Sequence, residues 1–142
     1  MIEADVVMTV QELNEFLAGA FPGAPRLYAV EDVGPDGIRM RLPYDAAQIR
    51  PGGTLSGPTM MGLADGAAWL ATLSRIGPVA LAVTSHLSID FLAKPGPADL
   101  LAHAKLLRLG RRRSVSEVRL WSDGTSIDDP VAFATVTYAI PS

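Results

Sequence analysis

Asp65 is the residue whose type and position most directly suggest chemistry. It lies within residues 57–71, a stretch of mostly apolar and small residues that otherwise predicts a buried helix. An aspartate is a poor helix former, and an unpaired carboxylate in apolar surroundings is costly or takes up a proton. A carboxylate at such a position is often a nucleophile or a general base. The structural alternative is a carboxylate that caps a loop or pairs with Arg50.

The helix that carries Asp65 is expected to run from about residue 58 to residue 74. Pro58 suits the first helical position, and Gly57 or Ser56 would cap it. Gly77 and the proline after it would end the helix.

Around this helix the sequence predicts a shorter N-terminal helix and six strands. Thr9 and Glu12 have the spacing of a capping box at the start of a helix over residues 9–21. The expected strands span residues 27–33, 37–42, 79–92, 98–109, 112–122 and 131–140, and residues 43–55 are expected to form a loop. An α+β fold in which a mostly antiparallel sheet curls around the apolar helix would bury that helix on most sides.

Composition narrows the classes of function. The 142 residues suit one domain, and a net charge of −3 argues against a general nucleic-acid binder. The chain has no cysteine, which excludes thiolate chemistry, and two histidines, which argues against a multi-histidine metal site. Glu3 and Asp5 interrupt the basic start and apolar run that a signal peptide would need. No later apolar run is long and unbroken enough to predict a membrane span. We therefore expect a cytoplasmic protein with no metal and no nucleic-acid or membrane partner.

A family resemblance rests on Leu55-Ser56-Gly57-Pro58 followed by Leu63-Ala64-Asp65-Gly66-Ala67. This stretch resembles the hotdog-fold acyl-CoA thioesterases of the phenylacetate-degradation (PaaI-like) type. Residues 84–95, the turn at 109–111 and residues 132–138 resemble further segments of that family in the same order. The resemblance implies one hotdog domain over residues 1–142 with an extra N-terminal helix. It also implies an acyl-CoA substrate and no cofactor other than the coenzyme A of that substrate.

The same resemblance assigns roles to residues of the site. Asp65 matches the nucleophile or general base, and the Gly57 N–H matches the donor that stabilises the oxyanion. Thr59 offers a second N–H at the helix start, and we assign it to substrate binding. Thr84 falls where some relatives have a serine or threonine, supplied by the partner subunit, that helps to place the water.

Two positions depart from the family pattern. Ser56 stands where the family often has histidine, and Arg50 stands near its usual asparagine or glutamine. Both positions contact the thioester or water in related enzymes, so we assign both residues to substrate binding. These departures leave three alternatives open, which are slow hydrolysis, a different substrate, and acyl-CoA binding without turnover.

The spacing of Gly57 and Asp65 predicts more than one subunit per site. Eight residues of helix span about 12 Å, which an aspartate side chain is too short to bridge. One copy of the helix therefore does not supply both groups to one carbonyl, whereas two antiparallel copies do. We expect a homodimer with composite sites, possibly paired into a dimer of dimers.

Residues 111–113 are three consecutive arginines and form the densest charge cluster. Arg111 and Arg112 are candidates for binding the phosphates of coenzyme A, with Arg111 matching the basic turn residue of the family. The alternative is a solvated hairpin turn.

Two other functions compete with hydrolysis. A non-catalytic acyl-CoA-binding or sensing module would use the same fold. A hotdog dehydratase or hydratase usually pairs a histidine with the acid near the central helix, and the expected helix over residues 58–74 contains no histidine.

Overall fold

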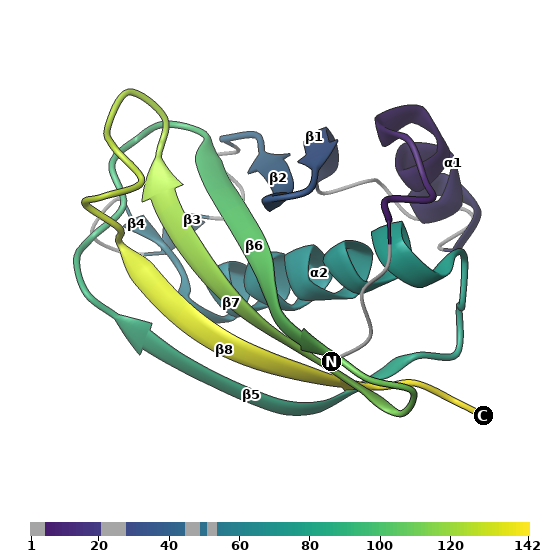
Figure 1. The fold of residues 1–142 in the computed structure, drawn as a ribbon. Helices are drawn as coiled ribbons and strands as arrows, with labels where there is room; N and C mark the ends of the chain where they lie inside the picture. Colours follow the sequence, from purple (N-terminus) through teal and green to yellow (C-terminus); the bar gives the residue numbers. More distant parts are fainter. Residues whose placement is uncertain (1–4, 21–27, 45–48, 51–53) are drawn as a thin grey trace.

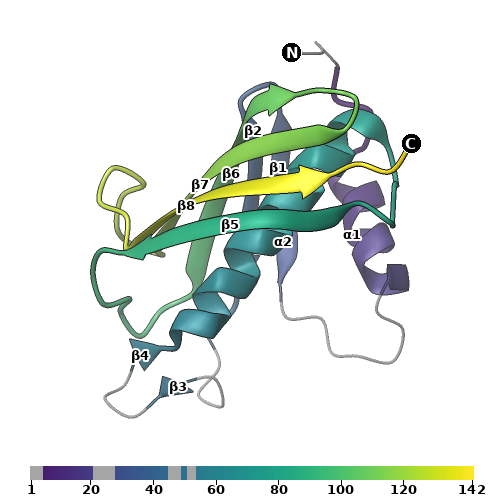
Figure 2. The ribbon, with the colours of Figure 1, turned by 90° about the horizontal axis from the view of Figure 1, so that it is seen from below.

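The computed structural model describes residues 5–20, 28–44, 49–50 and 54–142. Its largest element is a six-stranded antiparallel sheet that wraps around one long helix, α2 (Figures 1 and 2). The strand order is β1-β2-β6-β7-β8-β5. The strands are β1 (Ala29–Gly34), β2 (Gly37–Leu42), β5 (Val83–Phe91), β6 (Leu100–Leu109), β7 (Arg113–Ser122) and β8 (Ala132–Ala139). The expected α+β arrangement is therefore confirmed.

Helix α2 (Gly57–Ile76) is buried on most of its surface, as its apolar sequence predicted. Its residues pack against β2, β5, β6, β7 and β8, so the sheet curves around the helix (Figure 2). Gly77 ends the helix with a positive φ of 92°, which favours glycine, and its N–H donates to the Leu73 carbonyl.

Helix α1 (Val10–Ala20) begins with the expected capping box. The Thr9 N–H donates to Glu12 Oε1 at 3.0 Å, and the Glu12 N–H donates to Thr9 Oγ1 at 3.1 Å. The Asn14 side chain then bonds both the N–H and the carbonyl of Val30, which ties α1 to β1.

The alternating pattern in β2 has the expected orientation. Ile38, Met40 and Leu42 are buried against the helix side of the sheet, while Arg39 is exposed on the other face. Arg41 lies on that outer face too and pairs with Glu31 at 3.1 Å.

Two expected elements differ most from the structure. The expected loop over residues 43–55 contains two short paired strands, β3 (Ile49–Arg50) and β4 (Thr54–Leu55). A strand of two residues is too short to show a periodic pattern, which is why the sequence did not predict these two strands. The strand expected from residue 79 begins at Val83, because Val79 and Ala82 close a turn instead. Residues 21 and 27, where the first helix and first strand were expected to end and begin, lie outside the described residues.

In the part of the chain that the structure describes, neither helix combines the length and the apolar character needed to cross a bilayer.

Candidate active site

The Asp65 side chain is half-buried and accepts two hydrogen bonds from the sheet. Thr84 Oγ1 on β5 donates to Asp65 Oδ1 at 2.7 Å, and Tyr138 Oη on β8 donates to the same oxygen at 2.8 Å. Tyr138 Oη also lies 3.2 Å from the main-chain carbonyl oxygen of Asp65. None of the hydrogen bonds found among the described residues reaches Oδ2, so that oxygen is the one available for chemistry.

The strand register explains why two donors reach one carboxylate. Thr84 and Tyr138 are direct cross-strand partners, and the β5–β8 register shifts between Thr84 and His86. Tyr138 is in turn paired with Ser114 on β7. Ser114 Oγ lies 2.6 Å from Thr72 Oγ1 on α2. One row of hydroxyl groups across three strands therefore faces the helix, and Asp65 is bound by two of them.

The resemblance implies a partner-subunit hydroxyl at this position that helps to place the water, and in the single chain the same hydroxyl contacts the carboxylate of its own subunit. Thr84 and Asp65 of the same chain are hydrogen-bonded, because β5 at the sheet edge runs alongside α2. These two residues therefore belong to one half of any shared site.

A pocket of about 570 Å³ opens beside Asp65. Its aromatic side chains are Tyr28, Trp69 and Tyr138, and the remaining lining residues are small or apolar apart from Asp65 and Thr84. The Trp69 ring packs edge-on against Phe16 of α1, with ring centroids 5.3 Å apart. Helix α1, which the family pattern treats as an addition, thus supports one wall of this pocket.

Tyr28 lies directly over Gly66, the residue after Asp65. A Cβ at Gly66 would overlap the phenol ring of Tyr28, so glycine is required for this close approach. Burial, followed by the nearby charge of Asp65, raises the pKa of Tyr28. Burial likewise raises the pKa of Tyr138 and outweighs the opposing hydrogen bond with Thr84. Both phenols are therefore protonated around neutral pH.

The start of α2 is capped by Ser56. Its Oγ accepts a hydrogen bond from the Thr59 N–H at 3.2 Å and lies 2.8 Å from Thr59 Oγ1. The expectation that the Thr59 N–H is free for a carbonyl oxygen is therefore wrong, because the cap already uses it. The Gly57 N–H has no acceptor among the described residues, and it is the remaining donor of this pair.

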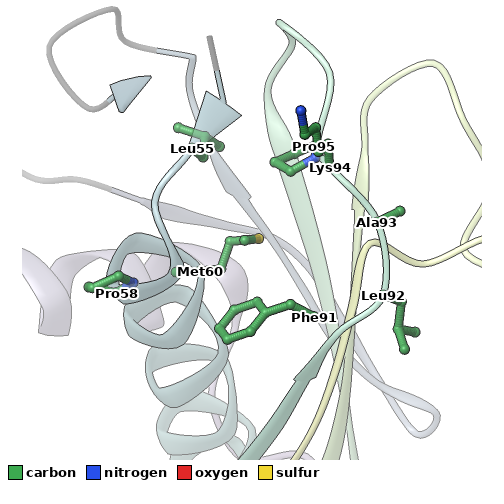
Figure 3. A pocket seen from close by; sticks show the side chains of 9 residues that line it. Leu55, Pro58, Met60, Phe91, Leu92, Ala93, Lys94 and Pro95 are labelled. Carbon is green, nitrogen blue, oxygen red and sulfur yellow. The ribbon is translucent and has the colours of Figure 1, made fainter. Parts of the chain in front are cut away.

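A second pocket, of about 610 Å³, opens beside the start of α2 (Figure 3). Phe91 forms one wall, and its Cζ lies 3.3 Å from the place where a Gly57 Cβ would be. Lys94 is the one charged residue of a lining that is otherwise apolar. The lining comprises Leu55, Gly57, Pro58, Met60, Phe91, Leu92, Ala93, Lys94 and Pro95.

A model of the thioesterase superfamily matches residues 52–127, which is more than half of the chain. The chain belongs to the thioesterase superfamily. It is 38% identical to a proposed thioesterase from Silicibacter sp. TM1040, with a TM-score of 0.88 and 98% of this chain and 96% of the other covered. No protein of curated function matches the chain.

More distant solved structures share the fold of this superfamily. Zebra fish thioesterase superfamily member 2 has a TM-score of 0.81 at 18% identity, covering 95% of this chain and 100% of the other. A Haemophilus influenzae thioesterase has a TM-score of 0.77 at 17% identity, covering 99% and 96%. The expected hotdog fold and the expected thioesterase family are confirmed, although the comparisons do not single out the PaaI-like type. Membership supports a thioester hydrolase activity in general.

The basic turn of this superfamily member lies near the Asp65 pocket. Arg113 pairs with Ala139 on β8, and Ala139 also pairs with Val83 of the pocket lining. Arg111 and Arg112 are exposed at the turn just before Arg113. They line neither of the two pockets, so the structure places them at the same end of the sheet without bringing them to the carboxylate.

One residue that the sequence assigned to substrate binding, Arg50, is not placed in the site. The side chain of Arg50 lies outside the part that the structure describes, so neither its role in binding nor its pairing with Asp65 is tested. No group of acidic or histidine side chains suited to a metal ion occurs among the described residues.

Sequence reasoning missed two residues of the site, Tyr28 and Tyr138. The alternating burial of β8 places Tyr138 on the inner face of the sheet, and an inward tyrosine needs a hydrogen-bond partner. That signal was present in the sequence, but its partner is 73 positions away. Only the strand order brings the two together.

Proposed function

We propose that this thioesterase-superfamily protein hydrolyses a small, medium-chain or aromatic acyl-CoA and belongs to the PaaI-like type. The observation that carries the proposal is the Asp65 carboxylate, bound through Oδ1 to Thr84 and Tyr138 at the mouth of a pocket. A fixed carboxylate with one oxygen available suits attack on a thioester or activation of a water.

The reaction has two forms consistent with this site. As a general base, Asp65 takes a proton from water while the water oxygen bonds to the thioester carbon. As a nucleophile, the carboxylate forms an anhydride that water then cleaves. In both, the C–S bond breaks, the thiolate of coenzyme A takes up a proton, and the acid is released. The Gly57 N–H would stabilise the oxyanion, a contribution typically worth about 10²–10³ in rate.

A homodimer would bring these two groups together. Strand β5 lies at an edge of the sheet, and Val83 and Phe91 at its ends are 57% and 48% exposed. Val83 lines the Asp65 pocket, whereas Phe91 lines the Gly57 pocket. Two β5 strands packed antiparallel about a twofold axis would set the Val83 end of one beside the Phe91 end of the other. Each Asp65 pocket would then adjoin Gly57 of the partner subunit.

The remaining assignments concern coenzyme A. Arg111 and Arg112, exposed near the Asp65 pocket, would bind its phosphates, and Arg50 would contact the substrate near the helix start. Ser56 and Thr59 would act indirectly, because their contacts with each other shape the helix start beside Gly57. We expect such an enzyme to act in the cytoplasm. Pairing of two dimers into a tetramer is compatible with the scheme.

A steady-state assay over a panel of acyl-CoA thioesters, with a thiol reagent to detect coenzyme A, tests this proposal. The parent protein should turn over at least one member, and Asp65→Asn should lose about 10²-fold or more in kcat. Turnover of no member, or an Asp65→Asn variant as fast as the parent, would contradict it.

One observation favours an alternative, a non-catalytic acyl-CoA-binding protein. The Ser56 hydroxyl is engaged by Thr59 at a position where the family often has a histidine. Isothermal titration with an acyl-CoA would show tight binding with no release of free thiol if this alternative is right.

A further inference from the structure

We propose that Tyr138 is a positioning residue that, together with Thr84, holds Asp65 Oδ1 and thereby directs Oδ2 toward the substrate. The inference rests on the proposed function of Asp65 and extends it to a residue on the last strand of the sheet.

The geometry gives Tyr138 a hold on two parts of Asp65. Its hydroxyl oxygen lies 2.8 Å from Oδ1 and 3.2 Å from the main-chain carbonyl of the same residue. A single hydroxyl between these two atoms fixes the side chain relative to the helix backbone. Thr84 adds a second donor to Oδ1 at 2.7 Å. With both donors on one oxygen, rotation of the carboxylate breaks two hydrogen bonds at once.

Tyr138 is itself rigidly placed. It is 5% exposed, its side chain extends from the sheet to Asp65 on α2, and its strand is paired on both sides, with β7 and with β5. Its partner across β5 is Thr84, so the same register that positions one donor positions the other. The two hydroxyls therefore act as a unit rather than as two independent contacts.

The protonation state suits a fixed donor. Burial raises the pKa of Tyr138, with the Asp65 charge acting in the same direction, so the phenol keeps its proton over the whole working range of an enzyme. A group that keeps its proton orients the carboxylate and does not exchange protons with the substrate. This separates Tyr138 from the groups that react.

The test compares Tyr138→Phe with Thr84→Val and with a control, Tyr44→Phe. Phenylalanine keeps the ring that packs in the core, and valine keeps the shape of threonine. Tyr44 is exposed and lines neither pocket, so Tyr44→Phe removes one phenol hydroxyl away from the site. We expect Tyr138→Phe to lower kcat about 10- to 100-fold with KM unchanged, because a misplaced group costs rate rather than binding. Tyr44→Phe should match the parent.

A second comparison separates positioning from general stability. In an Asp65→Asn background, Tyr138→Phe should cost no further activity, because its effect is exerted through the carboxylate. An equal loss in both backgrounds, or a Tyr138→Phe variant with the parent's kcat, overturns the inference.

A structural measurement tests the role of Tyr138 even if the proposed function is wrong. If the parent protein hydrolyses no acyl-CoA, a crystal structure of Tyr138→Phe decides the matter without activity. The Asp65 side chain should then adopt a different or mixed rotamer, and an Asp65 carboxylate in its original place would overturn the inference on its own.

Discussion

Gly57 and Asp65 lie eight residues apart on the same helix, yet they line two different pockets of the chain. Strand β5 connects the two pockets, since one of its ends lines each. A twofold axis between two paired β5 strands would place the Gly57 pocket of one subunit against the Asp65 pocket of the other. Under this proposal, quaternary structure becomes a condition of activity.

Subunit complementation should restore activity between two inactive variants. Gly57→Val presses against Phe91 and disturbs the oxyanion donor, and Asp65→Asn removes the base. Each homodimer should be inactive. Equal amounts refolded together should recover about a quarter of the parent activity, because half of the dimers are mixed and each mixed dimer has one intact site. The measurement is the rate of coenzyme A release.

The control for this experiment is a mixture of each variant with itself after the same refolding. Sites built from one chain alone would leave the mixed sample as inactive as its components, and the composite arrangement would then be wrong.

Charge on the exposed edge should dissociate the proposed dimer. We expect Val83→Lys combined with Phe91→Lys to convert a dimer into monomers, because like charges would face each other across the paired strands. Light scattering after size-exclusion chromatography measures the change. Leu107→Lys is the matched control, since Leu107 is 47% exposed on β6, away from β5 in the sheet order. A double variant that keeps the parent's mass would count against a β5 interface.

Loss of the Ser56 cap should weaken the helix start. Ser56→Ala removes the acceptor of the Thr59 N–H and should lower the free energy of unfolding by about 1 kcal/mol. Ser56→Asp, which retains an acceptor oxygen, should stay close to the parent. Urea denaturation monitored by circular dichroism gives both values. An alanine variant as stable as the parent would show that the cap contributes nothing measurable.

Acid should remove a stabilising contribution from Asp99. The Tyr44 N–H, at 2.7 Å from Oδ1, and the Arg41 guanidinium, at 2.9 Å from Oδ2, lower the pKa of this carboxyl below its usual value. A lowered pKa in the folded state stabilises the protein above the unfolded value of about 3.9, and protonation removes that contribution as the pH falls below it. The gap in Tm between the parent and Asp99→Asn should therefore be constant at neutral pH and shrink below about pH 4.

Asp5→Asn controls for the loss of one negative charge, because Asp5 is exposed and makes no such contacts with the described residues. A difference in Tm between the parent and Asp99→Asn that stays the same in acid would mean that the charge of Asp99 contributes nothing to stability.

Local patterns account for what could be predicted well. The capping box of Thr9 and Glu12 and the alternation of Ile38, Met40 and Leu42 each depend on residues a few positions apart. The Ser56 cap was also visible as a candidate, but its consequence for the Thr59 N–H was not. That consequence depends on which N–H the hydroxyl reaches, which only the side-chain geometry shows.

The long apolar helix and the carboxylate within it could be predicted from the sequence alone, because helical periodicity and the residues that end a helix are local properties. The spacing also showed that Gly57 and Asp65 are too far apart on one helix to serve one carbonyl. The residues that hold the carboxylate depend on the three-dimensional fold. Thr84 is 19 positions from Asp65 and Tyr138 is 73 positions away, and they meet at one oxygen because β5 and β8 are neighbours in a register that pairs them.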